Sequence, residues 1–236
     1  MSKSPNDLFM DDLIAEISSA YDRFGYSLGW RFLYGPKRTL SCPSGIVFLG
    51  LNPGGRRYSV DVSVEEGSAY IVERWGRRPN RPDGYAPGES PLQKQLRGLF
   101  DLLAANMPGD WKNGDELLAQ TLAANFCPFR SPDWKSLSNR KEAVEFSRTL
   151  WTRIFDEFTP KLILTMSGLS YNQLKRVLGR DPEESSLPTG WGKVEFKIAR
   201  YSDVTLARLP HLSTFKLMSR AGCVPHVAEF VRLVTN

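Results

Sequence analysis

Four short apolar runs rich in branched residues lie along the chain, and each is typical of a strand buried on both faces. They cover Ile46–Gly50, Leu118–Phe126, Lys161–Met166 and Val204–Leu209. Apolar residues at helical spacing lie between them, in residues 92–103 and 146–158, and a last helix is expected to begin at Pro225. Because strands alternate with helices, the pattern predicts an α/β fold, with a parallel sheet covered on both faces.

Polar residues follow three of these strands, at the rim where such sheets bind ligands. Asn52 follows the first strand, Asn125 lies near the end of the second, and His211 follows the fourth. Taken singly, each is explained as well by a tight turn or a structural hydrogen bond. Together they predict a polar site at the carboxyl ends of the strands.

One long segment, from Gly54 to Pro91, is rich in Gly, Pro, Arg and Tyr and has no clean period. A loop of this length in a compact domain is usually functional or partly mobile. We therefore expect it to border the site.

Length and composition favour one domain over residues 1–236, because 41% hydrophobic positions can form a substantial core. No apolar run is long enough to cross a membrane, and the polar, acidic start argues against export, so a cytoplasmic monomer is expected. Cys42, Cys127 and Cys223 are odd in number and far apart, which fits reduced thiols and excludes a four-thiolate metal site within one chain. Neither a metal nor a cofactor is expected.

The formal charge of +5 is modest, but the basic residues are unevenly distributed. Residues 74–82 hold four arginines and no acid, and residues 204–228 hold Arg208, Lys216 and Arg220 and no acid. Two basic segments beside a site suit a polyphosphate partner such as DNA.

The order and spacing of these motifs resemble the uracil-DNA glycosylase superfamily, most of all its single-strand-selective monofunctional and mismatch-specific branches. Gly50–Gly54 matches the G-x-N-P-G first motif, and Asn125-Phe126-Cys127-Pro128 is similar to the Asn-Tyr-Cys-Pro segment that reads uracil. His211-Leu212-Ser213 resembles the His-Pro-Ser motif that precedes a DNA-wedging loop, with Leu212 in place of the usual proline.

The resemblance implies a three-layer α/β/α fold with a central four-stranded parallel sheet, and a monofunctional enzyme of base excision repair. Such an enzyme flips uracil out of DNA and hydrolyses its N-glycosidic bond without lyase activity. The implied catalytic residues are Asn52, which positions water, and His211, which donates a hydrogen bond to uracil O2. The implied substrate-binding residues are Gly50, Leu51, Pro53, Gly54, Tyr70, Asn125 and Phe126. The implied DNA-binding residues are Ser90, Ser167, Gly168, Ser213, Phe215 and Lys216.

The chemistry of the residues agrees with these roles. An Asn side chain presents one acceptor and one donor, which match the N3–H and O4 of uracil but not the pairing edge of cytosine. Gly54 has no side chain to block a 5-substituent, so 5-substituted uracils are candidate substrates. Tyr58, Tyr70 and Phe126 offer rings for base stacking, with Tyr70 favoured.

Two other functions stay open. Leu212 and the lack of a carboxylate beside Asn52 are compatible with a DNA-binding protein of this fold that no longer cleaves. The sequence of residues 55–91 does not show how this loop would line a base pocket, so a glycosylase for deaminated purines is a further alternative. Phe215 likewise is either a wedge into the base stack or a core residue at a helix start.

Overall fold

The computed structural model describes residues 5–77, 80–179 and 181–235. The helices are α1 (Pro5–Arg23), α2 (Ala69–Val72), α3 (Pro91–Asn106), α4 (Gly114–Ala119), α5 (Arg140–Glu157), α6 (Gly168–Leu178) and α7 (Val224–Thr235). The strands are β1 (Gly29–Arg31), β2 (Ile46–Gly50), β3 (Ser59–Asp61), β4 (Leu122–Asn125), β5 (Leu162–Thr165), β6 (Glu183–Pro188), β7 (Glu195–Arg200) and β8 (Thr205–Arg208). Short 3-10 turns are η1 (Lys37–Ser41), η2 (Trp134–Ser136), η3 (Leu217–Ser219) and η4 (Ala221–Cys223).

The main sheet confirms the predicted α/β class but is larger than predicted. Its strand order is β4-β2-β5-β8-β7-β6, so it has six strands rather than four. The four predicted strands form its parallel part, and β7 and β6 extend it in antiparallel fashion beyond β8. The parallel strands therefore all end at one rim, which we call the carboxyl rim.

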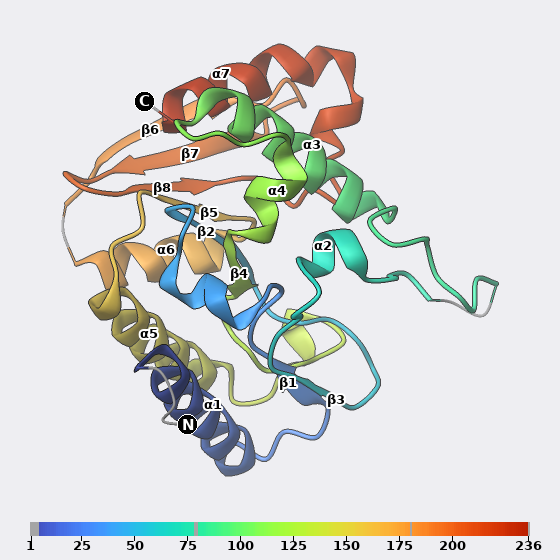
Figure 1. Cartoon of the computed structure of the whole chain (residues 1–236), viewed down its shortest axis with the longest axis vertical. Helices are drawn as coiled ribbons and strands as arrows, with labels where there is room; N and C mark the ends of the chain where they lie inside the picture. The colour runs from blue at the N-terminus through green and yellow to red at the C-terminus, as the bar shows by residue number, and fades with distance from the viewer. Residues whose placement is uncertain (1–4, 78–79, 180, 236) are drawn as a thin grey trace.

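Helices cover both faces of the sheet (Figure 1). Alternate residues of β2 divide between two hydrophobic clusters, with Val47 and Leu49 in one and Ile46 and Phe48 in the other. The first cluster includes apolar residues of α1, α5 and α6, and the second includes those of α3, α4 and α7. This double cover explains why β2 reads as a continuous apolar run.

The second predicted strand was wrong over its first residues. Asn113 accepts a hydrogen bond from the backbone N–H of Glu116 and so caps α4, which takes up Leu117 and Leu118. Strand β4 begins only at Leu122. Apolar residues continue on both sides of Gln120 and Thr121, and periodicity does not show that the helix ends and the strand begins at these two residues.

Several elements were not predicted. Helix α1 buries Met10, Leu13 and Ile17, and β7 alternates buried Phe196 and Ile198 with more exposed residues. The apolar spacing of both elements can be recognised in the sequence. Strand β6, by contrast, is almost wholly exposed, forms the sheet edge and ends at Pro188, so it carries no apolar signal.

The segment from Gly54 to Pro91 contains two short regular elements and is otherwise made of turns and irregular chain over its described length. Strand β3 pairs with β1 in a small parallel sheet, and α2 buries Ala69 and Tyr70 against the second cluster. Within the basic stretch 74–82, Arg78 and Pro79 lie outside the described residues. Polar contacts, described below, attach the segment to the rest of the molecule, and it has no periodic apolar face.

The thiols of Cys42, Cys127 and Cys223 are free and buried. No helix in the described part of the chain has the length and apolar character needed to cross a membrane.

Candidate active site

The register of the sheet brings the predicted site segments to one rim. Gly50 pairs with Asn125, while Thr165 lies opposite both Leu49 and Arg208. At roughly 4.8 Å per strand, the end of β8 lies about 10 Å from that of β2. Asn52, Asn125 and His211 therefore share the carboxyl rim, although no described hydrogen bond joins any one of them to another.

Asn125 is buried, with 6% of its surface exposed, and its amide is oriented by two contacts. Its Nδ2 donates a hydrogen bond to the Tyr34 hydroxyl oxygen over 2.9 Å. A Cβ on Gly50 would lie 2.2 Å from Asn125 Oδ1, so the amide occupies space that only a glycine leaves open. Gly50 therefore contributes to the site by leaving space for the Asn125 amide.

Tyr34 is held in place by two contacts to its ring. Its ring stacks on Tyr70 at a centroid distance of 5.4 Å, and the Arg31 guanidinium carbon lies 4.0 Å from the ring centroid. Burial raises the pKa of the Tyr34 phenol, so the hydroxyl stays protonated near neutral pH. Tyr34 was not predicted, since it lies 91 residues before Asn125 and no local spacing links them.

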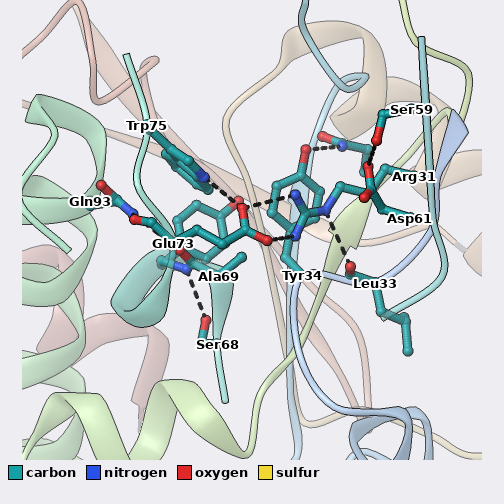
Figure 2. Close-up of polar contacts among 12 residues, drawn as sticks. Arg31, Leu33, Tyr34, Ser59, Asp61, Ser68, Ala69, Glu73, Trp75 and Gln93 are labelled. Carbon is teal, nitrogen blue, oxygen red and sulfur yellow. Dashed lines mark hydrogen bonds and ion pairs between the residues drawn. The ribbon is translucent and has the colours of Figure 1, made fainter. Parts of the chain in front are cut away.

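Arg31 and Glu73 form the centre of a polar cluster beside Tyr34 (Figure 2). The guanidinium donates to both Glu73 carboxylate oxygens, over 3.0 and 2.6 Å, and Glu73 Oε2 also accepts from Trp75 Nε1 over 2.7 Å. Gln93 of α3 donates from its Nε2 to the backbone carbonyls of Ala69 and Glu73. Residues 69–75 are thereby fixed against both Tyr34 and α3.

Asn52 is half-buried in the turn after β2 and is bound to the segment after β4. Its Nδ2 donates to Ser131 Oγ over 2.8 Å and to the Phe129 carbonyl over 3.4 Å. The backbone N–H of Ser131 donates to the carbonyl of Pro53, which is buried. Among the described residues none donates to Asn52 Oδ1, so this oxygen is the free end of the amide.

Gly54 and the half-buried Leu51 complete the turn. The Gly54 carbonyl accepts a hydrogen bond from Arg130 over 2.6 Å, and Arg130 also pairs with Asp61 of β3 over 2.9 Å. A Cβ on Gly54 would meet no atom within 4 Å. The backbone of this position is therefore fixed while the space beside it is open.

His211 begins a short loop, residues 211–216, which we call the His loop. Its Nδ1 lies 2.8 Å from Ser213 Oγ, and burial lowers the pKa of the imidazole below its ordinary value of 6.5. Leu212 is buried in the second cluster, and the carbonyl of His211 accepts from the backbone N–H groups of Thr214 and Phe215. The loop is thus anchored by an apolar side chain where the related motif has proline.

Apart from Leu212 and Phe215, the residues of the His loop, His211 included, are exposed. Phe215 is half-buried, with its ring edge-to-face against Trp191 at 5.8 Å, and Lys216 is exposed. The guanidinium of Arg220 lies 4.3 Å from the Trp191 ring centroid. Phe215 therefore has one side in contact with protein and one side toward solvent.

Ser167 and Gly168 lie at the carboxyl rim, at the start of α6. The Ser167 hydroxyl accepts from the backbone N–H of Ser170 as the N-cap of α6. A Cβ on Gly168 would lie 3.5 Å from an Arg208 guanidinium nitrogen. A helix start beside an arginine is suited to an anion.

Three other predicted residues lie where direct contact with a ligand is not supported. Ser90 is buried and caps α3 in a capping box with Gln93, so its hydroxyl is already used. Phe126 is fully buried in the first cluster, on the side of the sheet away from Asn125. Tyr70 is 3% exposed and already stacks on Tyr34, which makes it a support for that residue.

Two surface hollows are described, one between α5 and α6 and one beside Tyr201, and neither is lined by Asn52, Asn125 or His211. The described residues contain no group of three or more His, Cys, Asp or Glu side chains arranged to hold a metal ion. The sequence matches no protein-family model and no curated protein. The function must therefore be argued from the residues at the rim.

Proposed function

We propose that this protein is a monofunctional DNA glycosylase that hydrolyses the N-glycosidic bond of uracil in DNA. The observation that carries the proposal is the position of Asn52, Asn125 and His211 at one rim of the sheet, each at or after the end of a different strand. The helix-covered parallel sheet agrees with the three-layer architecture of the superfamily that the motifs resemble.

Asn125 would read the base. Its Nδ2 carries two hydrogens, of which one is donated to Tyr34 and the other is left for uracil O4. Its Oδ1 would accept from uracil N3–H. Cytosine offers an acceptor and an amino group at these positions, so it would leave buried polar groups unpaired.

His211 would stabilise the departing base. When Ser213 donates to Nδ1, the proton of the neutral imidazole is carried by Nε2 and can be donated to uracil O2. The lowered pKa keeps the ring neutral near pH 7. Negative charge develops on uracil as the bond breaks, and a preoriented donor stabilises it as in an oxyanion hole.

Asn52 would position the attacking water. Its Nδ2 is bound to the protein, and Oδ1 can accept a hydrogen bond from water. Because an amide is a very weak base, the reaction would depend more on departure of the base than on proton abstraction.

The absence of lyase activity is part of the proposal. Lyase chemistry needs an amine nucleophile, and the residues at Asn52, Asn125 and His211 supply none. Lys216 is the nearest amine in sequence to His211. Borohydride should therefore trap no covalent adduct with uracil-containing DNA, and an adduct lost in Lys216→Ala would contradict this part.

The open space beside Gly54 supports activity on 5-substituted uracils. A large residue there should act as a selective barrier, so Gly54→Phe should lower excision of 5-hydroxymethyluracil more than that of uracil. Equal losses for the two bases would contradict this assignment.

The decisive assay uses oligonucleotides with a single uracil, hypoxanthine or xanthine, followed by alkali to break abasic sites. We expect cleavage at uracil, reduced about 10²–10³-fold in His211→Ala, as for loss of one preoriented donor. Asn125→Ala should abolish discrimination and most activity. Matched controls are His226→Ala and Asn106→Ala, which remove the same groups away from the rim.

Other outcomes separate the remaining functions. Tight binding of uracil-containing DNA without cleavage would assign a DNA-binding protein of this fold. Cleavage only at hypoxanthine or xanthine would assign a deaminated-purine glycosylase.

A further inference from the structure

The groove between α5 and α6 is the second feature of the molecule suited to nucleic acid. It encloses about 460 Å³ and is lined by four cationic side chains, Arg140, Lys141, Arg148 and Arg176, against one acid, Glu145. Figure 1 shows the two helices packed side by side. We call this hollow the α5–α6 groove.

None of the four groove cations forms an ion pair with an acidic side chain in the described part of the chain. Arg148 is half-buried, whereas Arg140, Lys141 and Arg176 are exposed. Four cations against one acid give the groove a net positive charge, which suits an anionic ligand.

Two buried polar atoms of the groove lack any hydrogen bond. They are Nε of Arg148, a donor, and Oε1 of Gln173, an acceptor, and Gln173 is only 8% exposed. Both residues line the groove. Since buried polar atoms normally have partners, these two indicate a ligand that both accepts and donates hydrogen bonds.

A partly exposed aromatic side chain and the position of the groove next to the rim indicate which class of ligand the groove suits. Trp134 lines the groove and is only partly buried, so it can offer a surface for base stacking. Leu169 also lines it, directly after Ser167 and Gly168 of the carboxyl rim. One end of the groove therefore lies beside the start of α6, next to the rim. Cations that follow a backbone, together with an aromatic for stacking, are typical of single-strand binding sites.

We propose that the α5–α6 groove binds a single-stranded stretch of DNA that flanks the nucleotide held at the carboxyl rim. Arg148 and Arg176 contact phosphates, Gln173 accepts a hydrogen bond from a base, and Trp134 stacks on a base. The inference rests on the proposed function in taking DNA as the substrate, but it concerns binding outside the reacting nucleotide.

The test measures binding without catalysis. The probe is a fluorescein-labelled oligothymidylate of about 16 nucleotides without uracil, followed by fluorescence anisotropy. The double variant Arg148→Gln/Arg176→Gln should raise Kd at least about tenfold and reduce the slope of log K against log salt by about 1.4, or 0.7 per lost contact. Gln173→Glu, nearly identical in shape, should weaken binding by placing a negative charge in the groove. Trp134→Ala should weaken it at least about fivefold.

The matched control removes the same charge elsewhere. Arg38 and Lys161 are exposed and lie near the amino ends of β2 and β5, opposite the rim. Arg38→Gln/Lys161→Gln should change Kd by less than about twofold, because net charge alone contributes little at a distance beyond the Debye length. Thermal unfolding midpoints of all variants should match that of the unmodified protein.

Three outcomes overturn the inference. Equal weakening by the two double variants would mean that only net charge matters. If polyglutamate at equal charge concentration displaced the oligothymidylate, the groove would be a general anion-binding surface instead. Unchanged oligothymidylate binding in the groove variants, in a protein that still removes uracil, would reject the groove and leave the proposed function standing.

The opposite combination is also informative. Weaker binding in the groove variants, in a protein that removes no base, would support the groove as a single-strand site and reject the glycosylase. A protein that neither binds oligothymidylate nor removes uracil would overturn both proposals.

Discussion

The amide of Asn125 depends on residues from two other parts of the chain. Gly50 leaves the space that its Oδ1 occupies, Tyr34 accepts from its Nδ2, and Arg31 lies over the Tyr34 ring. An amide that reads a base must be fixed in one orientation, since a flip exchanges its donor and its acceptor. Under the proposed function, these contacts therefore determine which base edge Asn125 would match.

Replacing Tyr34 by Phe keeps the ring stack but removes the hydroxyl that orients the amide. We expect the ratio of kcat/KM for uracil over cytosine to fall about tenfold, the effect of about 1.4 kcal/mol. Excision assays on matched uracil and cytosine oligonucleotides measure it. Tyr58→Phe removes a hydroxyl from an exposed tyrosine and is the control. A fall in rate with the ratio unchanged would mean that Tyr34 has only a structural role.

Substituting Ala for Gly50 should damage activity more than stability. The new Cβ would lie 2.2 Å from the flexible end of Asn125, which must turn away. A displacement of about 1 Å at a reacting group costs about 10² in rate. Gly222→Ala, whose Cβ would meet no atom within 4 Å, is the matched control. Retention of full excision activity in Gly50→Ala would contradict the assigned role of Asn125.

His211 gives a pH dependence of stability with a defined sign. Burial lowers the pKa of the folded imidazole below 6.5, so the unfolded chain binds more protons in the interval under that value. Stability should accordingly fall as the pH decreases from about 7 to about 5, and His211→Gln should reduce this dependence. Urea midpoints across that range measure it. An unchanged slope in the variant would show that other groups cause the loss.

At the level of elements, residues 54–91 are fixed mainly by polar contacts. Arg31 and Glu73 join β1 to the end of α2, and Gln93 joins α2 to α3. Arg130 joins the turn after β2 to β3. The segment therefore depends on a small number of charged groups whose loss should loosen it locally.

Removing the Glu73 carboxylate should expose this dependence. Glu73→Ala leaves the Arg31 guanidinium, whose side chain is 9% exposed, without its partner. We expect a loss of about 2–3 kcal/mol in the free energy of unfolding, from urea denaturation. Glu229→Ala breaks the exposed pair with Arg232 and should leave that free energy essentially unchanged. Similar values for both variants would mean that the cluster does not stabilise the segment.

The elements located from the sequence carry either a continuous apolar run or apolar residues at helical spacing. All four parallel strands were located from such runs, and α3, α5 and α7 from a regular apolar face, whereas α1 and β7 were missed although they also bury a regular set of apolar residues. Strand β6 gave no signal, since its residues are mostly exposed and polar and it is held by pairing with β7 and by contacts of Glu184 with α6. For the site, Asn52, Asn125 and His211 were located from strand ends, whereas Arg31, Tyr34 and Glu73 meet only through tertiary contacts that spacing does not encode.

For the whole molecule, the three thiols report on how the chain unfolds. Burial raises the pKa of Cys42 and of Cys127 to about 12, and Cys223 is fully buried. A thiol reagent near neutral pH should therefore modify all three together, at the rate of global unfolding. Mass spectrometry of the partly modified protein measures this. Early modification of one thiol would instead reveal local opening around it.

The edge strand β6 has a consequence for encounters between copies of the chain. An open sheet edge invites pairing with another strand, and proteins prevent this with charges and proline. Here the edge carries Glu183 and Glu184 at one end and Pro188 at the other. At the opposite side of the sheet, residues 33 and 34 bond to β4 and cover it. Both margins thus resist pairing with a strand of a second copy, which is the first step of cross-β aggregation.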